Sequence, residues 1–179
     1  MPPLEVDIAR ARIDALAADV IGALGLPQGA VVGLFAPMQA EAGPVALDVR
    51  LRGLGLKTAW PRVTGPDALT FHVLTHASGL TAGYRGLREP PPEAPEIPCD
   101  AIALLLVPGL GFDVEGGRLG RGGGFYDRQL ARLRPTTPRL ALAFARQVSP
   151  TPIPRDPHDA CVDAVLTEDG LITTTRWPR

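Results

Sequence analysis

The stretch AIALLLVPGLGFDVEGGRLGRGGGFYDRQL, residues 101–130, combines three features that together indicate a fold and a chemistry. An apolar run at 101–107 predicts a buried strand, and a glycine-rich loop with two arginines follows it at 116–124. The loop leads into a helix whose first turn contains Asp127. The N–H groups of such a loop, the N-terminus of a helix and guanidinium groups all attract phosphate. The stretch therefore predicts phosphate chemistry at the carboxyl end of a strand.

Patterns of helix and strand alternate on both sides of this stretch. Apolar residues recur at helical spacing from Ile13 to Leu24 and from Leu47 to Leu54, and Pro44 is suited to begin the second helix. Short β-rich runs predict strands at residues 30–36, 57–60, 69–74, 139–145 and 162–167, with the second ending before Pro61. Because strands alternate with helices, we expect an α/β layered fold with a largely parallel sheet.

Composition narrows the class of protein. The 179 residues are most simply one domain, and 45% hydrophobic with 21% charged residues is typical of a globular protein. A net charge of −1 gives no basic footprint for nucleic acid. Lys57 is the only lysine, so no P-loop is present.

The chain also shows no targeting or membrane pattern. Its longest apolar run is far too short to span a bilayer, and the N-terminus lacks the order of a signal peptide. The two cysteines, Cys99 and Cys161, cannot form a disulfide framework and suggest a reducing compartment. We therefore expect a cytoplasmic monomer that binds small molecules.

The glycine loop is the strongest candidate for a binding site. Its arginines can make forked contacts to phosphate oxygens, and its glycines let the backbone approach a ligand. A flexible hairpin with solvated arginines is the alternative interpretation. A dinucleotide site is disfavoured, because Gly120, Gly122 and Gly124 alternate by two and miss the pattern Gly-x-Gly-x-x-Gly.

Acidic residues in three segments are further candidates. Asp127 lies in the first helical turn, and Asp159 follows His158 in a proline-rich loop with Asp163 beyond it. Two carboxylates from distant segments can share one Mg²⁺. The alternatives are a helix-dipole role for Asp127 and a turn role for Asp159. Glu41 follows the strand at 30–36 and can face the same cleft, or it is an exposed loop acid.

The sequence also contains an arginine and two histidines whose roles have more than one interpretation. Arg62 follows Trp60 and Pro61, and has the same two readings as Glu41. His72 and His76 are four apart, but their segment reads as a strand, so we expect structural roles.

The motifs VPGLGFD (107–113) and RLGRGGGFYDR (118–128) resemble the most specific motifs of the 5-formyltetrahydrofolate cyclo-ligase family. Flanking pieces around residues 35–41, 60–62 and 86–90 are similar to the family's and occur in its order. The resemblance covers about residues 10–170. It implies a three-layer α/β/α sandwich with a mostly parallel central sheet. It also implies conversion of 5-formyltetrahydrofolate and MgATP to 5,10-methenyltetrahydrofolate, ADP and phosphate.

The resemblance implies roles for particular residues. Arg121 would face the transferred phosphoryl group, and Glu41 would bind the amino-pyrimidine edge of the pterin. Phe125 and Tyr126 would also line the folate pocket, and Asp127 and Asp159 would hold Mg²⁺. The residues that would bind the phosphates of ATP are Arg118, Leu119, Gly120, Arg121, Gly122, Gly123, Gly124, Phe125 and Tyr126.

One departure from the family leaves an alternative open. The family usually begins with a helix that carries Lys-x-x-x-Arg and contacts ATP, whereas this chain has no lysine before Lys57. A divergent member that binds folate or nucleotide without turnover is therefore the second hypothesis. An enzyme of sugar phosphates or acyl-CoA on a similar layered fold is the third, and it rests on fold analogy alone.

Overall fold

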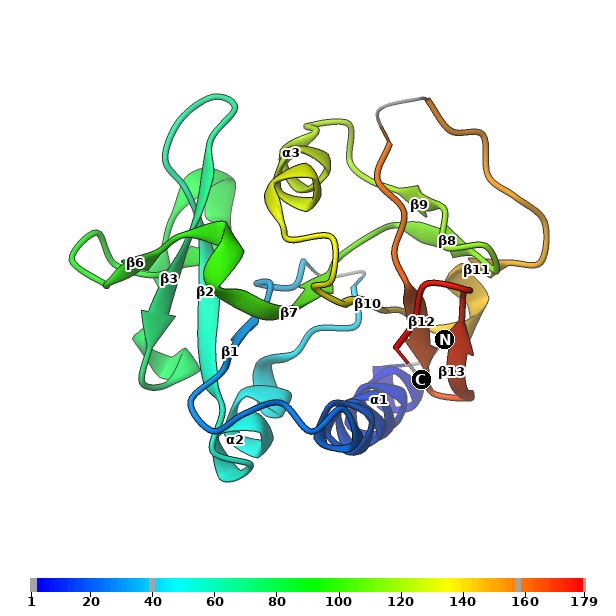
Figure 1. Ribbon diagram of the computed structural model, residues 1–179, viewed down its shortest axis with the longest axis horizontal. Helices are drawn as coiled ribbons and strands as arrows, with labels where there is room; N and C mark the ends of the chain where they lie inside the picture. The colour runs from blue at the N-terminus through cyan, green and yellow to red at the C-terminus, as the bar shows by residue number, and fades with distance from the viewer. Residues whose placement is uncertain (1–2, 39–40, 157–158, 179) are drawn as a thin grey trace.

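A computed structural model describes residues 3–38, 41–156 and 159–178, and an eight-stranded sheet runs through its centre (Figure 1). The strand order is β13-β12-β10-β7-β1-β2-β3-β6. The central strands from β12 to β2 are parallel, and antiparallel strands extend the sheet at both edges. The strands are β1 (Val31–Gly33), β2 (Lys57–Val63), β3 (Leu69–Leu74), β6 (Glu96–Ile97), β7 (Ile102–Val107), β10 (Arg139–Leu142), β12 (Ala164–Thr167) and β13 (Gly170–Thr173).

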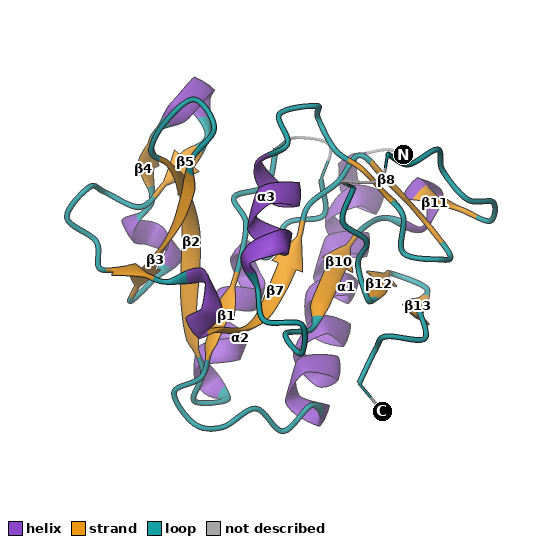
Figure 2. Ribbon diagram, turned by 45° about the horizontal axis from the view of Figure 1, so that its top comes forward, coloured by secondary structure: helices purple, strands orange, loops and turns teal. Residues whose placement is uncertain are grey.

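Helices cover both faces of the sheet. In Figure 2, α1 (Pro3–Ala23) and α2 (Val45–Gly53) lie behind the strands, and α3 (Phe125–Arg132) lies in front of them. The three layers confirm the expected α/β/α sandwich with a mostly parallel sheet. In the described part of the chain, four short 3-10 helices lie in the connections, at Ala77–Gly79, Tyr84–Gly86, Cys99–Ala101 and Ala145–Gln147.

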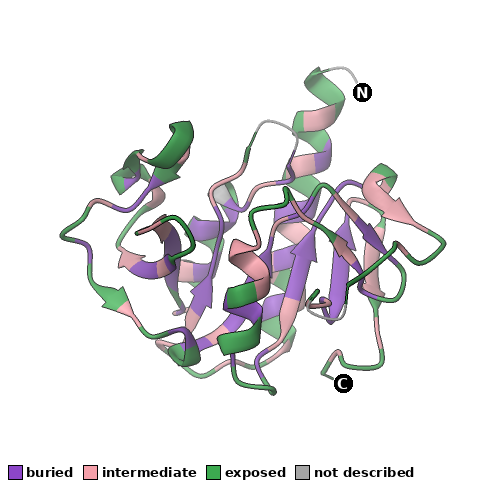
Figure 3. Cartoon of the chain, turned by 90° about the horizontal axis from the view of Figure 1, so that it is seen from above, coloured by how far each residue is buried: buried purple, intermediate pink, exposed green. Residues whose placement is uncertain are grey.

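The strand β7 has a core on each side. Leu104 and Leu106 pack in the cluster that contains the buried residues of α1 and α2, whereas Leu105 and Val107 pack in the cluster of α3. All four side chains are fully buried, and Figure 3 shows the central strands as the buried interior of the molecule. This explains why the run at 101–107 is continuously apolar: a strand covered on both faces has no side for polar residues.

Proline does not end β2, contrary to the sequence prediction. The strand continues through Pro61, which pairs with Phe71 of β3. The carbonyl of Ala59 accepts the N–H of Leu34, and the N–H of Val63 donates to the Glu89 carboxylate. Residues 59, 61 and 63 therefore direct their backbone N–H and C=O groups to the edge of β2 that faces away from β3. Since β1 pairs with β2 only as far as Ala59, the missing N–H of Pro61 faces no strand and no ladder bond is lost.

Other boundaries and two small sheets also differ from expectation. β1 ends at Gly33 and β10 at Leu142, earlier than the predicted 36 and 145. The small sheets join β8 (Gly111–Asp113), β9 (Arg118–Leu119) and β11 (Val148–Ser149), and pair β4 (Thr81–Ala82) with β5 (Arg88–Glu89). These short pairs matter because they frame the glycine loop and the rim of the cavity described below. Among the described residues, none of the helices has the length and apolarity needed to cross a membrane.

Candidate active site

A cavity of about 300 Å³ opens where β1 and β7 end, and most of the predicted site residues line it. Phe35 follows β1 and Pro108 follows β7 at its inner wall. This is the edge of a parallel sheet at which α/β proteins bind ligands. The predicted residues that line the cavity are Glu41, Arg118, Gly120, Arg121, Gly122, Gly123, Gly124, Phe125, Tyr126 and Asp127. Leu119 and Asp159 do not line it.

The glycine loop ends in a left-handed turn that begins α3. Gly124 is the N-cap residue, with φ 61° and ψ 6°, and its carbonyl accepts the first helical bond from Arg128 at 3.2 Å. A residue with a side chain would be strained in this conformation. Glycine at this position therefore lets the chain turn sharply from the loop into the helix, with Phe125, Tyr126 and Asp127 in the first turn against the cavity.

Arg118 and Asp127 form a tight ion pair across the start of this loop. The Nη2 atom of Arg118 lies 2.6 Å from Oδ1 of Asp127, and the Arg118 side chain is only 6% exposed. The Arg118 Nε is buried and has no hydrogen-bond partner among the described residues. Asp127 therefore balances the charge of Arg118, and the buried Nε of the arginine is left as a donor without a partner among the described residues.

Arg121 and Glu41 form a looser pair between segments that are 80 residues apart in the chain. The Nε atom of Arg121 lies 3.4 Å from Oε1 of Glu41, and the arginine side chain is 44% exposed whereas the glutamate is 7% exposed. Oε2 of Glu41 accepts the N–H of Met38 at 2.9 Å. The acid is thus fixed inside the cavity, and the arginine, held by one long contact, is available to a ligand.

Tyr126 contributes a buried hydroxyl to the same wall. Its oxygen has no hydrogen-bond partner in the described part of the chain. Burial raises the pKa of the Tyr126 phenol, the charge of Glu41 raises it further, and Arg118 opposes both. Tyr126 therefore stays protonated and can donate a hydrogen bond to a group that enters the cavity.

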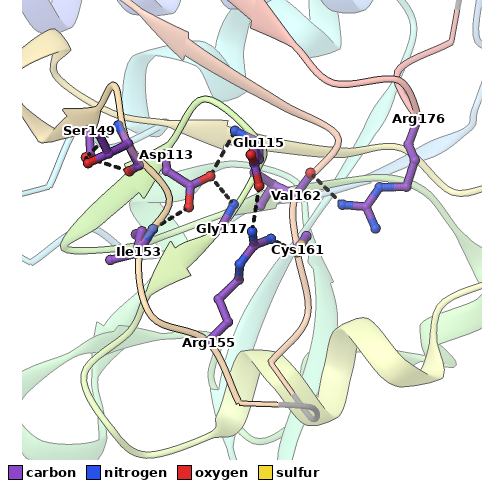
Figure 4. A network of polar contacts seen from close by, with 10 residues as sticks. Asp113, Glu115, Gly117, Ser149, Ile153, Arg155, Cys161, Val162 and Arg176 are labelled. Carbon is purple, nitrogen blue, oxygen red and sulfur yellow. Dashed lines mark hydrogen bonds and ion pairs between the residues drawn. The ribbon is translucent and has the colours of Figure 1, made fainter.

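A buried carboxylate holds the strand that leads to the glycine loop (Figure 4). Asp113 accepts hydrogen bonds from the backbone of Gly117 and Ile153 at 2.8 Å and of Glu115 at 2.9 Å. Its carboxylate leaves no room for a side chain at Gly117. Burial alone would raise the pKa of Asp113, but these three donors, together with Arg155, lower it below the usual value. Asp113 thus fixes the turn just before Arg118 and ties it to the segment that carries Asp159.

Asp159 lies in that exposed segment rather than in the cavity. Its Oδ2 accepts the backbone N–H of Asp156 at 2.8 Å, which is the turn contact that a sequence reading allows. His158 is outside the described residues. Within residues 3–38, 41–156 and 159–178, no group of three or more His, Cys, Asp or Glu side chains could hold a metal ion.

The opposite wall is one that the sequence identified only in part. Tyr84, Arg85 and Glu89 of the β4–β5 hairpin line the cavity, and the ring of Tyr84 meets Phe125 edge-on with centroids 6.5 Å apart. The sequence indicated residues 86–90 through their similarity to the family, but it did not single out Tyr84 or Arg85 between Gly83 and Gly86. Such a short loop reads equally well as a solvated turn, so its place on the wall required the fold.

The remaining candidates have structural contacts. His72 is buried and bonds through its ring to the carbonyl of Ala94 and to Thr70, as expected for a structural histidine. The guanidinium of Arg62 donates to the carbonyl of Pro90. Asp163 accepts the backbone N–H of Arg139 at 2.9 Å, next to the sheet rather than the cavity.

Sequence comparison relates the chain to enzymes of one kind. Residues 6–168 match the model of the 5-formyltetrahydrofolate cyclo-ligase family. The chain is 36% identical over 155 residues to a 5-formyltetrahydrofolate cyclo-ligase of Mycolicibacterium smegmatis, a match that covers 83% of this chain and 78% of the relative. It is 51% identical over 75 residues to the mouse protein of the same name, covering 38% of this chain and 36% of the mouse protein.

Structure comparison agrees. The 5,10-methenyltetrahydrofolate synthetase of Aquifex aeolicus superposes with a TM-score of 0.75 at 26% identity, over 95% of this chain and 85% of that one. The synthetase of Mycoplasma pneumoniae has the same fold, with a TM-score of 0.75 at 20% identity, over 94% of this chain and 90% of that one. With the matched region spanning the sheet, the glycine loop and the cavity, the chain belongs to the 5-formyltetrahydrofolate cyclo-ligase family, a family of ligases.

Proposed function

We propose that this protein converts 5-formyltetrahydrofolate and MgATP to 5,10-methenyltetrahydrofolate, ADP and phosphate. The observation that carries the proposal is the contact between Arg121 and Glu41. A carboxylate suited to the pterin edge and an arginine suited to phosphate lie 3.4 Å apart in one cavity. Two substrates bound to these side chains would be neighbours, which is what a transfer between them requires.

The reaction mainly requires that the two substrates are positioned and that the charge of the transferred phosphoryl group is neutralised. In the proposed reaction the formyl oxygen attacks the γ-phosphorus and ADP leaves. N10 of the folate then attacks the activated formyl carbon, the ring closes and phosphate departs, with the N10 proton lost to solvent. Arg121 would stabilise the charge on the transferred phosphoryl group, and Glu41 would hold the donor N–H groups of the pterin.

The remaining cavity residues suit binding. The unused Nε donor of Arg118 and the backbone of Gly120, Gly122, Gly123 and Gly124 would hold phosphate oxygens. Phe125 and Tyr126 would flank the folate, and the Tyr126 hydroxyl would donate to it. Each of these groups is a donor or an apolar surface, so the wall suits an anionic and aromatic pair of substrates. Leu119 has an exposed side chain, so any contact that it makes to phosphate would be through its backbone.

The carboxylate of Asp127 would hold Mg²⁺ only together with oxygen atoms of the substrates. One oxygen of Asp127 pairs with Arg118, and the side chain is 26% exposed, which leaves the other oxygen for a cation. Mg²⁺ is commonly held by one or two carboxylates and by the phosphates of a nucleotide. We propose Asp127 as one ligand and the exposed Asp159 as the second, and the ion would neutralise phosphate charge.

The test is the ATP-dependent appearance of methenyl-folate absorbance. Arg121→Ala should lower kcat about 100-fold, because a donor to the transition state is lost. Its free energy of unfolding should change by less than about 0.5 kcal/mol, since the arginine is half-exposed. The matched control is Arg134→Ala, in the exposed turn after α3, which should leave both quantities unchanged.

One result would overturn the proposed reaction. Folded wild-type protein that produces no methenyl-folate with ATP present would reject the ligase reaction. If calorimetry then showed folate or nucleotide binding without ADP release, the protein would be the non-catalytic binding member considered above.

Asp127→Ala should abolish turnover, and turnover independent of Mg²⁺ would remove the metal from the proposal. The monomeric state and the cytoplasmic location also belong to this proposal, and sedimentation and fractionation test them.

A further inference from the structure

Among the described residues, one cation on the cavity wall has neither an ion-pair nor a hydrogen-bond partner for its side chain. Arg118 pairs with Asp127, Arg121 pairs with Glu41, and the guanidinium of Arg88 donates to the carbonyl of Leu80 at 2.6 Å. Arg85 lies over the ring of Tyr84, 5.1 Å from its centroid. Among the described residues it forms neither an ion pair nor a hydrogen bond through its side chain. The guanidinium is therefore positioned by an aromatic ring and left with its donors unused.

The backbone at this arginine is also unusual. Arg85 has φ 50° and ψ 35°, and it is the one non-glycine residue with positive φ in the described part of the chain. This left-handed conformation is unfavourable for a residue with a side chain. A surrounding structure has to impose it, and such conformations are concentrated where a ligand or a switch needs them.

The hairpin around Arg85 is firmly anchored. β4 and β5 pair Thr81 with Glu89 and Ala82 with Arg88, and the N–H of Gly83 donates to Leu87 at 2.7 Å. The buried Glu89 carboxylate accepts the N–H of Val63 at 3.1 Å, which ties the hairpin to β2. Arg85 is thus presented from a fixed support at the rim of the cavity rather than from a free loop.

Depth in the cavity gives the substrate an orientation. Glu41 is buried, so the pterin edge that it would bind lies at the bottom. Tyr84 is 38% exposed and Arg85 is exposed, so the other end of a folate would emerge between them. That end carries glutamate carboxylates, and a guanidinium is the side chain best suited to a carboxylate.

From these observations we infer that Arg85 binds the carboxylate of the glutamyl tail of the folate and so selects glutamylated over non-glutamylated pterins. This inference rests on the proposed function for the identity of the substrate. It adds a specificity-determining residue on the wall opposite the glycine loop. The aromatic rings of Tyr84 and Phe125 would flank the segment between pterin and tail.

Equilibrium binding by calorimetry tests the inference without relying on turnover. The two probes are 5-formyltetrahydrofolate and 5-formyltetrahydropteroate, which lacks the glutamate. Arg85→Gly suits the backbone conformation and removes the guanidinium together with its contact to the Tyr84 ring. It should weaken binding of the folate about fivefold to tenfold and leave binding of the pteroate unchanged. Arg85→Lys should retain part of the difference, and Arg134→Gly, a charge loss outside the cavity, should retain all of it.

The outcomes separate the two proposals. Equal weakening of both probes by Arg85→Gly, or no weakening of either, would overturn the role of Arg85 even if the wild-type protein is an active ligase. A selective loss with an inactive wild-type protein would support the tail site and reject the ligase reaction. A wild-type protein that binds neither probe would overturn both.

Discussion

Two buried carboxylates, one beside the glycine loop and one in α1, show how differently the same group is accommodated. Asp113 is 0% exposed and accepts three backbone N–H groups, and its pKa is lowered. Asp14 is 5% exposed, its Oδ1 has no partner among the described residues, and burial raises its pKa to about 6 against the opposing charge of Arg50. The difference shows that burial by itself does not determine the cost of a charge. The donors within reach determine it.

The largest effect should follow from Asp113→Asn. The amide would turn one of its donors toward backbone N–H groups that need an acceptor, so at least one would be left unsatisfied. We expect the free energy of unfolding to fall by about 3 kcal/mol in urea denaturation at pH 7. The variant should also lose activity, because the turn before Arg118 would no longer be fixed. The control, Asp156→Asn in the exposed loop, should be neutral, and equal stability of the two variants would contradict this account.

Asp14→Asn should have a smaller effect of the opposite sign. The folded-state pKa of about 6 exceeds the ordinary value of 3.8, so the charged carboxylate penalises the fold increasingly as pH rises from about 4 to 6. Removing the charge should raise the free energy of unfolding by about 1–2 kcal/mol at pH 8 and by little at pH 4. Asp19→Asn, on an exposed position of the same helix, provides the comparison. If the free energy of unfolding of Asp14→Asn depended on pH as it does in the wild-type protein, the carboxylate would be better solvated than the fold indicates.

Arg176→Ala tests Asp163, a buried carboxylate that is intermediate between Asp113 and Asp14 because it accepts one backbone N–H. This substitution should have the smallest effect of the three. Asp163 accepts the N–H of Arg139, and Nε of Arg176 lies 3.4 Å from its Oδ1. Burial raises the pKa of Asp163 and both arginines lower it, so loss of Arg176 should raise it further. Because Arg176 is 49% exposed, stability at pH 7 should change by less than about 0.5 kcal/mol. Carbon-13 NMR titration of the Asp163 carboxyl measures the shift, and an unchanged pKa would exclude the pairing in solution.

Much of the fold could be predicted because it follows from local patterns. The spacing of apolar residues, with glycine or proline at an end, predicts α2, α3, β7 and the second half of α1, whereas the first part of α1, from Pro3, was not predicted. The continuation of β2 through Pro61 could not be predicted, since it depends on where the neighbouring strand β1 stops. The two-residue strands are equally dependent on context, because they are too short to have a pattern of their own.

In the candidate site too, some features could be predicted from the sequence and others depend on the tertiary structure. The glycine loop could be identified from residues that adjoin one another in the chain, and Arg118, Arg121 and Asp127 line the cavity as expected. Their pairing could not: Arg121 contacts Glu41 only because strands distant in sequence end side by side, and Arg118 contacts Asp127 only because the glycine loop folds β9 back against the first turn of α3. The roles given to these residues, and to Asp159 in its exposed loop, remain predictions.

By itself the sequence determined the layered α/β class and placed glycines and arginine donors together in the loop at 116–124, because apolar periodicity and adjacent donors are properties of neighbouring residues. Only the tertiary structure decided which charges neutralise one another and which stay available. The hairpin that presents Arg85 and the segment that presents Glu41 meet the glycine loop through sheet topology. Strength of an electrostatic contact depends on distance and on exclusion of water, and both are set by packing between segments that the order of residues does not specify.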